Sequence, residues 1–175
     1  SEDAQKIYSL NFKSEFLGSD ISKVSENKIK EFRVSLPKIQ VIIGGPPCQG
    51  FSLTGKRDKE DKRNYLFKDY LRFVAMFSPK IAVMENVDKL LSMKNKEGKL
   101  VIFKIEEEFK KFGYKIQYKK FNTSDFGVPQ NRFRVIFVAV RDDINKEPSF
   151  PSVIYEEPNI QLKLKDIKKK FNFSD

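Results

Sequence analysis

The chain has 175 residues, with 34 Lys and Arg against 24 Asp and Glu, a formal net charge of +10, one Cys, and no His or Trp. These counts exclude a Ser-His-Asp triad, a Cys-His pair, a His/Cys zinc site and an internal disulfide, because each needs a His or a second Cys. The excess of positive charge favours a polyanionic partner, with nucleic acid first, although a solvated lysine-rich surface gives the same composition.

The N-terminal part of the chain carries one strong signal after two weak ones. Residues 3–10 have apolar side chains at helical spacing and predict a short helix, and residues 16–21 predict a short strand. Residues 39–43 form a largely β-branched run that stops at a Gly-Gly-Pro-Pro sequence. Such a run predicts a strand that is buried on both faces, as in a parallel sheet.

Two helices and a second buried strand are predicted in the middle of the chain. Residues 64–77 carry apolar side chains at helical spacing, with Asn64 as the N-cap and a Ser-Pro sequence as the stop. Residues 81–84 predict a buried strand, and residues 100–112 predict a helix that ends at Gly113. The order strand, helix, strand, helix is typical of an α/β fold with a mostly parallel sheet.

Two further strands are predicted in the last part of the fold. Residues 114–121 alternate like a half-buried strand, and residues 133–140 are strongly apolar. Because no helix separates them, we expect an antiparallel pair at one edge of the sheet. Beyond residue 142, prolines interrupt regular structure, although residues 162–170 have the spacing of a small basic helix. No repeat or low-complexity linker divides the chain, so we expect one domain or a piece of one.

The first candidate site is the sequence Gly-Gly-Pro-Pro-Cys-Gln-Gly-Phe-Ser at residues 44–52. It follows a buried strand, at the edge where open α/β sheets bind ligands. Backbone N–H groups and the downstream Lys56 and Arg57 favour a thiolate at Cys48. A lone Cys is also often a small buried hydrophobe, but its Pro-Pro and Gln-Gly neighbours suit a core poorly. Residues 53–63 have no apolar face and predict a loop, which either closes over a bound polyanion or is merely solvated.

Glu85 and two arginines are the other candidates for chemistry. Glu85 ends the second buried strand, so we expect it at the same edge as Cys48, where it is placed for acid chemistry. Taken alone, such an acid is often a helix cap or a surface residue. Arg132 and Arg134 follow Gln130 and alternate at the start of a strand, which predicts that both point to one face and hold a phosphate and a base carbonyl. Taken alone, they would be two solvated arginines.

Together, the Pro-Cys-Gln, Glu-Asn-Val and Gln-x-Arg-x-Arg motifs, in this order and spacing, resemble the DNA cytosine C5-methyltransferases of bacterial type. The resemblance runs from about residue 4 to residue 141 and implies a partial Rossmann-like fold of the S-adenosylmethionine-dependent methyltransferases. It implies a catalytic core at residues 1–145 and the start of a linker toward a target-recognition region at residues 146–175. The implied reaction moves a methyl group from S-adenosylmethionine to C5 of a cytosine flipped out of double-stranded DNA.

The resemblance also implies a role for individual residues. Cys48 resembles the nucleophile that attacks cytosine C6, and Glu85 resembles the acid at N3 and the exocyclic amine. Arg134 resembles the contact to the base at O2, and Arg132 a neighbouring positioning contact. The implied cofactor contacts are Asp20, Ile21, Pro47 and Leu66. The implied DNA contacts are Gln49, Ser52, Lys56, Arg57 and Gln130.

Two parts of the family's sequence are not found in the chain. The family begins with a strand, a Phe-x-Gly-x-Gly cofactor loop and a second strand, and it ends with the target-recognition region and a further motif. In the family's sheet the first two strands lie between the segments that match residues 16–21 and 39–43. We therefore expect unpaired backbone groups there, and a chain inactive alone. A complementary chain of a split enzyme, a permuted protein and a truncated one all remain open.

Two other functions compete with DNA methylation. A catalytically idle methyltransferase-like subunit would bind DNA or a protein partner without using Cys48, and a related enzyme would methylate RNA cytosine. The Gly-Phe-Ser sequence after Gln49 looks more like the bacterial DNA enzymes. The lone Cys, the acidic N-terminus and the lack of an apolar run of about 20 residues predict a cytoplasmic, nucleoid-associated bacterial protein without membrane or metal.

Overall fold

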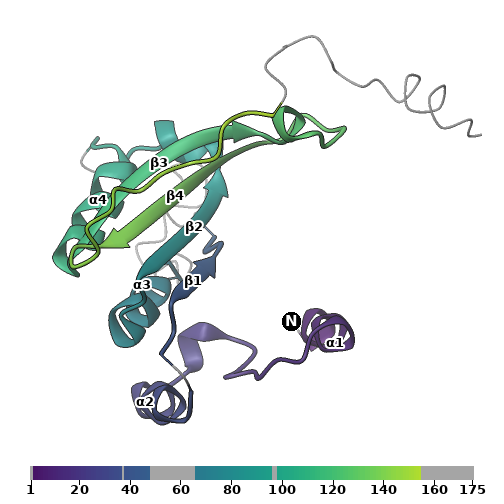
Figure 1. The fold of residues 1–175 in the computed structure, drawn as a ribbon, viewed down its shortest axis with the longest axis vertical. Coiled ribbons are helices and arrows are strands. Elements are labelled where there is room, and N and C mark those ends of the chain that lie inside the picture. The colour runs from purple at the N-terminus through teal and green to yellow at the C-terminus, as the bar shows by residue number, and fades with distance from the viewer. Residues whose placement is uncertain (1, 37, 48–65, 96–97, 155–175) are drawn as a thin grey trace, which may run out of the picture.

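A computed structural model describes residues 2–36, 38–47, 66–95 and 98–154 of the chain. In these ranges four strands form one sheet in the order β1-β2-β4-β3 (Figure 1). The strands are β1 (Val41–Gly44), β2 (Ile81–Val87), β3 (Tyr114–Asn122) and β4 (Phe133–Arg141). The helices are α1 (Glu2–Asn11), α2 (Glu26–Ser35), α3 (Leu66–Phe77) and α4 (Val101–Lys111).

The connections between the strands explain their directions. Parallel strands need a long crossover, and β1 is followed by α3 before β2 pairs with it in parallel. The chain from β3 to β4 has only a 3₁₀ turn at Thr123–Phe126, and Gly127 ends that turn with a φ of 85°. β4 therefore returns antiparallel to β3 and also pairs antiparallel with β2. The α/β class and the antiparallel edge pair are confirmed.

The position of β4 makes the sheet mixed. β1, β2 and β3 run in one direction, as a mostly parallel sheet predicts, but β4 lies between β2 and β3 in the opposite direction. Only the β1–β2 pairing is therefore parallel among the described strands. Local periodicity predicts where a strand lies along the chain but does not say which strands become neighbours.

In the N-terminal segment one sequence prediction is wrong and one helix was not predicted. Residues 16–21 do not form a strand, and a 3₁₀ turn at Ile21–Lys23 follows them. Helix α2 was not predicted, because Ile29 is its only buried residue and it lacks an apolar stripe. Its one sequence signal is Ser25, the N-cap, whose Oγ accepts a hydrogen bond from the backbone N–H of Lys28 at 3.2 Å. The predicted basic helix at residues 162–170 lies outside the described residues.

Helices α3 and α4 cover the same face of the sheet and form the main core with it. β2 and β4 each bury every second side chain beneath these helices. From the helices, Tyr70, Val74, Ile105 and Phe109 fill the layer between. None of the helices in the described ranges has the length and apolar content that a membrane span requires.

The prediction that β1 is buried on both faces is wrong. Val41 is 46% exposed and Ile43 is 76% exposed. β1 is the first strand in the order of the described sheet, and α3 covers only the face toward which Ile42 packs. The apolar run is therefore real, but no described element covers the other face of this strand.

Replacing Phe109 with Ala should lower the free energy of unfolding by about 3–5 kcal/mol, because the fully buried ring leaves a cavity in the core. Its ring centroid lies 6.5 Å from that of Tyr70 and 6.2 Å from that of Tyr114. Phe103 is on the same helix but 57% exposed, so Phe103→Ala should change the value by no more than about 0.5 kcal/mol. Urea denaturation of both variants checks this, and equal losses would contradict the assigned core.

Candidate active site

The parallel pairing of β1 and β2 brings two sequence motifs together at one edge of the sheet. Gly44 pairs with Met84, so the turn after β1 lies beside the end of β2. A Cβ atom added to Gly45 would lie 3.2 Å from Glu85 Oε2. That is closer than most Cβ contacts in proteins, so the missing side chain at Gly45 leaves room for the carboxylate.

Asn86 holds the turn after β1 in place. Tyrosines aside, it is the one polar or charged residue that is buried among the described residues, at 6% exposure. Its Nδ2 donates a hydrogen bond to the carbonyl oxygen of Pro46 at 2.9 Å, and its Oδ1 accepts one from the N–H of Val87 at 2.9 Å. Both ends of the buried amide are thus satisfied. The sequence motif includes Asn86, but sequence analysis gave it no role.

Glu85 and Arg134 form an ion pair across β2 and β4. Arg134 Nε lies 2.6 Å from Glu85 Oε1, and the side chains are 22% and 46% exposed. Arg134 pairs with Val87 and Glu85 pairs with Ile136, so the two charged residues are diagonal neighbours on one face. Arg134 also donates to the carbonyl oxygen of Phe133 at 2.7 Å. The structure thus joins two residues that the sequence placed in separate motifs.

Arg132 and Gln130 lie just before β4 and are both exposed. The Arg132 backbone N–H donates to Asn122 Oδ1 at 3.0 Å, and its carbonyl oxygen accepts from the N–H of Thr123 at 3.1 Å. Thr123 Oγ1 donates to the carbonyl oxygen of Gln130 at 2.5 Å. These bonds hold the backbone of the loop and leave its two long side chains pointing to solvent.

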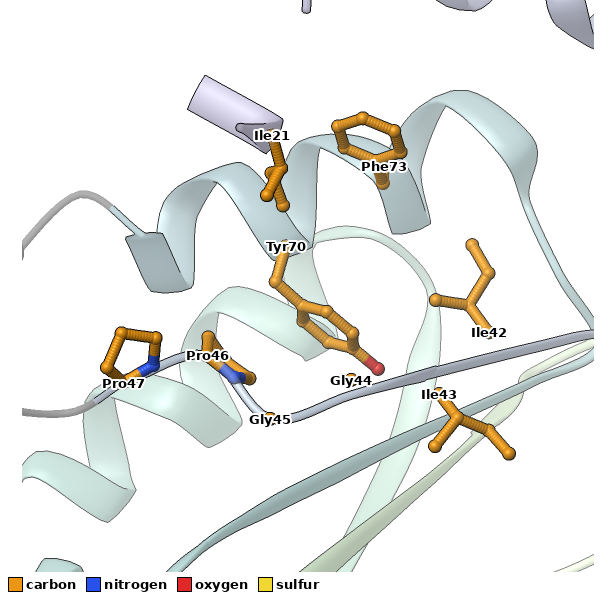
Figure 2. Close-up of a pocket in the computed structure, with 9 residues that line it drawn as sticks. All are labelled: Ile21, Ile42, Ile43, Gly44, Gly45, Pro46, Pro47, Tyr70 and Phe73. Carbon is orange, nitrogen blue, oxygen red and sulfur yellow. The ribbon is translucent and has the colours of Figure 1, made fainter. Parts of the chain in front are cut away.

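A cavity of about 310 Å³ lies between the turn after β1 and helix α3 (Figure 2). Two of the predicted cofactor contacts, Ile21 and Pro47, are both in its wall. Its lining is almost entirely apolar and consists of Ile21, Ile42, Ile43, Gly44, Gly45, Pro46, Pro47, Tyr70 and Phe73. This composition suits the flat ring of a nucleoside better than a charged group.

Tyr70 shapes the floor of this cavity. A Cβ atom added to Gly44 would come within 2.7 Å of the Tyr70 ring, so only glycine fits there. The Tyr70 hydroxyl donates to the carbonyl oxygen of Val83 at 2.9 Å, and burial raises the pKa of this hydroxyl well above its usual range. Tyr70 is therefore a neutral wall residue, and the sequence indicated only that it faces the core.

Of the other predicted site residues, the structure describes the positions of some, and the rest lie outside the described ranges. Asp20 caps the 3₁₀ turn: its Oδ1 accepts from the N–H and the Oγ of Ser22 at 3.0 and 2.7 Å, and these bonds lower the pKa of the carboxyl. Leu66 is the first residue of α3. The described residues contain no cluster of three or more potential metal ligands. Cys48, Gln49, Ser52, Lys56 and Arg57 lie outside the described residues.

A second cavity, of about 390 Å³, opens on the face of the sheet that α3 and α4 do not cover. Glu85 and Arg134 are in its wall, together with Phe121, Phe126 and Phe150. The ring centroid of Phe121 lies 5.5 Å from that of Phe126 and 5.8 Å from that of Phe150. Sequence analysis missed these aromatic residues, because two of the three lie outside any strand. The ion pair therefore lies at the rim of an aromatic cavity.

Comparison with known proteins assigns the chain to a family. Residues 1–174 match the family described as C-5 cytosine-specific DNA methylase. The chain belongs to this family. The resemblance found in the sequence motifs is thereby confirmed, and so is the fold class.

Relatives of this chain include bacterial Type II methyltransferases. The chain is 46% identical over 141 residues to the Type II methyltransferase M.DdeI of Desulfomicrobium norvegicum. The aligned residues are 80% of the chain and 33% of the relative. The chain is 39% identical over 156 residues to M1.HphI of Haemophilus parahaemolyticus, covering 87% of the chain and 40% of that protein. The chain thus spans a third to two-fifths of the length of these relatives.

Solved structures show the same fold for this methylase chain. The Dnmt2 methyltransferase of S. pombe superposes with a TM-score of 0.64 at 20% identity, covering 93% of the chain and 49% of that structure. A DNMT2 variant from Spodoptera frugiperda superposes with a TM-score of 0.61 at 23% identity, covering 90% and 46%. At this identity the likeness concerns the fold alone.

Replacing Asn86 with Ala should lower the free energy of unfolding by about 1–3 kcal/mol, because the carbonyl of Pro46 and the N–H of Val87 lose their partner away from water. Asn86→Asp keeps the acceptor for Val87 but not the donor to Pro46, so it should also destabilise. Asn11→Ala removes an exposed amide on α1 and should change the value by no more than about 0.5 kcal/mol. Urea denaturation measures all three, and an Asn86→Ala result like that of Asn11→Ala would contradict the anchoring role.

Proposed function

We propose that the protein to which this chain belongs transfers a methyl group from S-adenosylmethionine to C5 of a cytosine flipped out of double-stranded DNA. The observation that carries the proposal is the Glu85–Arg134 pair, which lies beside the turn that leads directly to Cys48. A carboxyl group and a guanidinium from two separate motifs meet there, and Cys48, the proposed nucleophile, follows Pro47 directly in the sequence. Membership of the cytosine C5 family supports this chemistry.

The apolar cavity beside α3 fits the adenosyl part of the cofactor. Gly44 and Gly45 let the chain pass close to Tyr70 and Glu85, and Ile21 and Pro47 supply separate parts of the wall. When bound, S-adenosylmethionine supplies an electrophilic methyl group on a sulfonium. Asp20, which is not in the wall, and Leu66, the first residue of α3, are also proposed to contact the cofactor.

The residues of the chain make the cytosine ring reactive. The Cys48 thiolate adds to C6, and Glu85 stabilises the ring at N3 and the exocyclic amine, so that electron density moves to C5. C5 then accepts the methyl group as the S–CH3 bond breaks and S-adenosylhomocysteine leaves, and loss of the C5 proton to water with β-elimination releases Cys48 as a thiolate. Arg134 occupies Glu85 Oε1 and leaves Oε2 on the side of Gly45, which fixes the direction in which the carboxyl presents its second oxygen.

DNA is the proposed partner because base flipping and the formal net charge of +10 both suit a polyanion. Arg132 and Gln130 are exposed and lie close to Arg134 in the sequence. We propose that they contact the DNA, together with Gln49, Ser52, Lys56 and Arg57. We further propose a catalytic core at residues 1–145 that continues into a linker, a cytoplasmic bacterial setting near the nucleoid, and a complementary segment or chain that completes the cofactor site.

The protein should form a covalent adduct with duplex DNA that contains 5-fluorocytosine, in the presence of S-adenosylmethionine, because fluorine cannot leave C5 as a cation. Since the chain spans a third to two-fifths of its relatives, the assay includes the flanking or complementary segments that they carry. Denaturing gels measure the adduct. Cys48→Ala should abolish it, and Glu85→Gln should slow it by about 100-fold or more. Glu31→Gln, at an exposed site on α2, should leave the rate unchanged.

The outcomes of this assay separate the competing functions. No adduct with the wild-type protein, or an equal adduct with Cys48→Ala, would remove the catalytic proposal in favour of an idle binding subunit. If the adduct forms faster with 5-fluorocytosine in RNA than in DNA, the substrate is RNA and the proposed reaction at C5 is unchanged.

A further inference from the structure

The wall of the cofactor cavity combines two distant parts of the chain. β1, the turn that follows it and α3 supply eight of the nine lining residues, and Ile21 supplies the other (Figure 2). Figure 2 shows Ile21 on the same side as Phe73, above the Tyr70 ring. The width of the cavity therefore depends on where the short segment that carries Ile21 is held.

This segment cannot hold its position by packing alone. The 3₁₀ turn at Ile21–Lys23 has three residues and buries none of them, and Ile21 is 38% exposed. Short 3₁₀ turns have poor hydrogen-bond geometry and need support from their surroundings. The nearest apolar anchor is Val24, which packs with Ile29 and Phe77 just beyond the turn.

Arg72 of α3 supplies the missing support through a single guanidinium. Its Nη2 donates to the carbonyl oxygen of Ile21 at 2.7 Å, and its Nη1 donates to that of Val24 at 2.7 Å. Asp69 lies one helical turn earlier, with its Oδ1 3.3 Å from Nη2. The side chains of Arg72 and Asp69 are 24% and 17% exposed, so both are partly shielded from water, although the bond to the Ile21 carbonyl lies at an exposed site.

The arrangement links the turn to the residues that shape the cavity. Arg72 lies on α3 between Tyr70 and Phe73, both of which line the cavity, and its guanidinium carbon is 5.4 Å from the centroid of the Phe73 ring. Arg72 itself is not in the wall. Its planar fork bonds two carbonyl groups at once, which the single ammonium group of a lysine does less well.

We propose that Arg72 is a positioning residue that sets the affinity for the adenosyl group of the cofactor by holding Ile21 against the cavity. The inference rests on the proposed function, because it takes the cavity to be the cofactor site. Arg72 does not touch the ligand and acts through Ile21. Without the guanidinium, the carbonyl of Val24 loses this donor and that of Ile21 keeps only the 3.4 Å bond from the Val24 N–H, so the turn is free to move away from Phe73.

The test measures the dissociation constant of S-adenosylhomocysteine by calorimetry and the steady-state constants for S-adenosylmethionine and DNA, in the same complete protein as the adduct assay. Arg72→Gln should raise the dissociation constant and the cofactor KM by about 10- to 100-fold, because two charge-assisted bonds are lost. The kcat at saturating cofactor and the KM for DNA should change by less than about threefold. Arg72→Lys should restore part of the affinity, and Arg33→Gln, at an exposed site on α2, should behave as wild type.

A double-variant cycle separates positioning from a general loss of structure. If Arg72 acts through Ile21, then Ile21→Ala should also raise the cofactor KM, and the double variant should be no weaker than the more affected single variant. Fully additive losses, unchanged binding in Arg72→Gln, or an equal loss of kcat and DNA affinity would each overturn the inference. A wild-type protein that binds no S-adenosylhomocysteine would instead contradict the proposed function itself.

Discussion

The parallel pairing of β1 with β2 is the constraint on which the candidate site depends, and the hydrogen bond from Asn86 to Pro46 extends it beyond the last paired residue. The ladder ends at Gly44, and the next residues turn away from the sheet. The buried amide of Asn86, near the end of β2, donates to the carbonyl of Pro46 in that turn at 2.9 Å. Cys48 follows Pro47 directly in the sequence. This bond therefore fixes the backbone position from which the chain continues to the proposed nucleophile.

Three residues of helix α3 contact the segments around the β1–β2 junction. Tyr70 packs on Gly44 and donates to the carbonyl of Val83, so its ring spans the β1–β2 junction. Phe73 lines the cavity one turn later, and Arg72 ties the Ile21–Lys23 turn to the same helix. A helix that first appears to be a simple crossover thus contacts every described element around the cavity. Its apolar spacing predicts the packing role of these residues but not the bonds made by Arg72.

Sequence patterns predicted the elements whose side chains alternate between core and solvent, but they ended the second strand at Glu85, whereas β2 continues for two more residues to Val87. They could not predict that β4 lies between β2 and β3, because strand order depends on long-range pairing. They overestimated the burial of β1, since an apolar run shows only that a strand can be covered and not that it is. The roles of Asn86 and Arg72 could not be predicted for a related reason. Each side chain donates to a backbone carbonyl of a distant segment, and carbonyls have no sequence signature.

The absence of histidine is compatible with the geometry of the Glu85–Arg134 pair. An imidazole offers one donor and one acceptor whose directions are set by its tautomer. Here a carboxylate gains a similar directionality because a guanidinium holds Oε1 at 2.6 Å and Gly45 leaves space beside Oε2. The two oxygens are therefore no longer equivalent, and in the proposed function Oε2 is the oxygen that faces the base. Neighbouring strands fix both partners, so the orientation comes from the sheet itself rather than from a flexible loop.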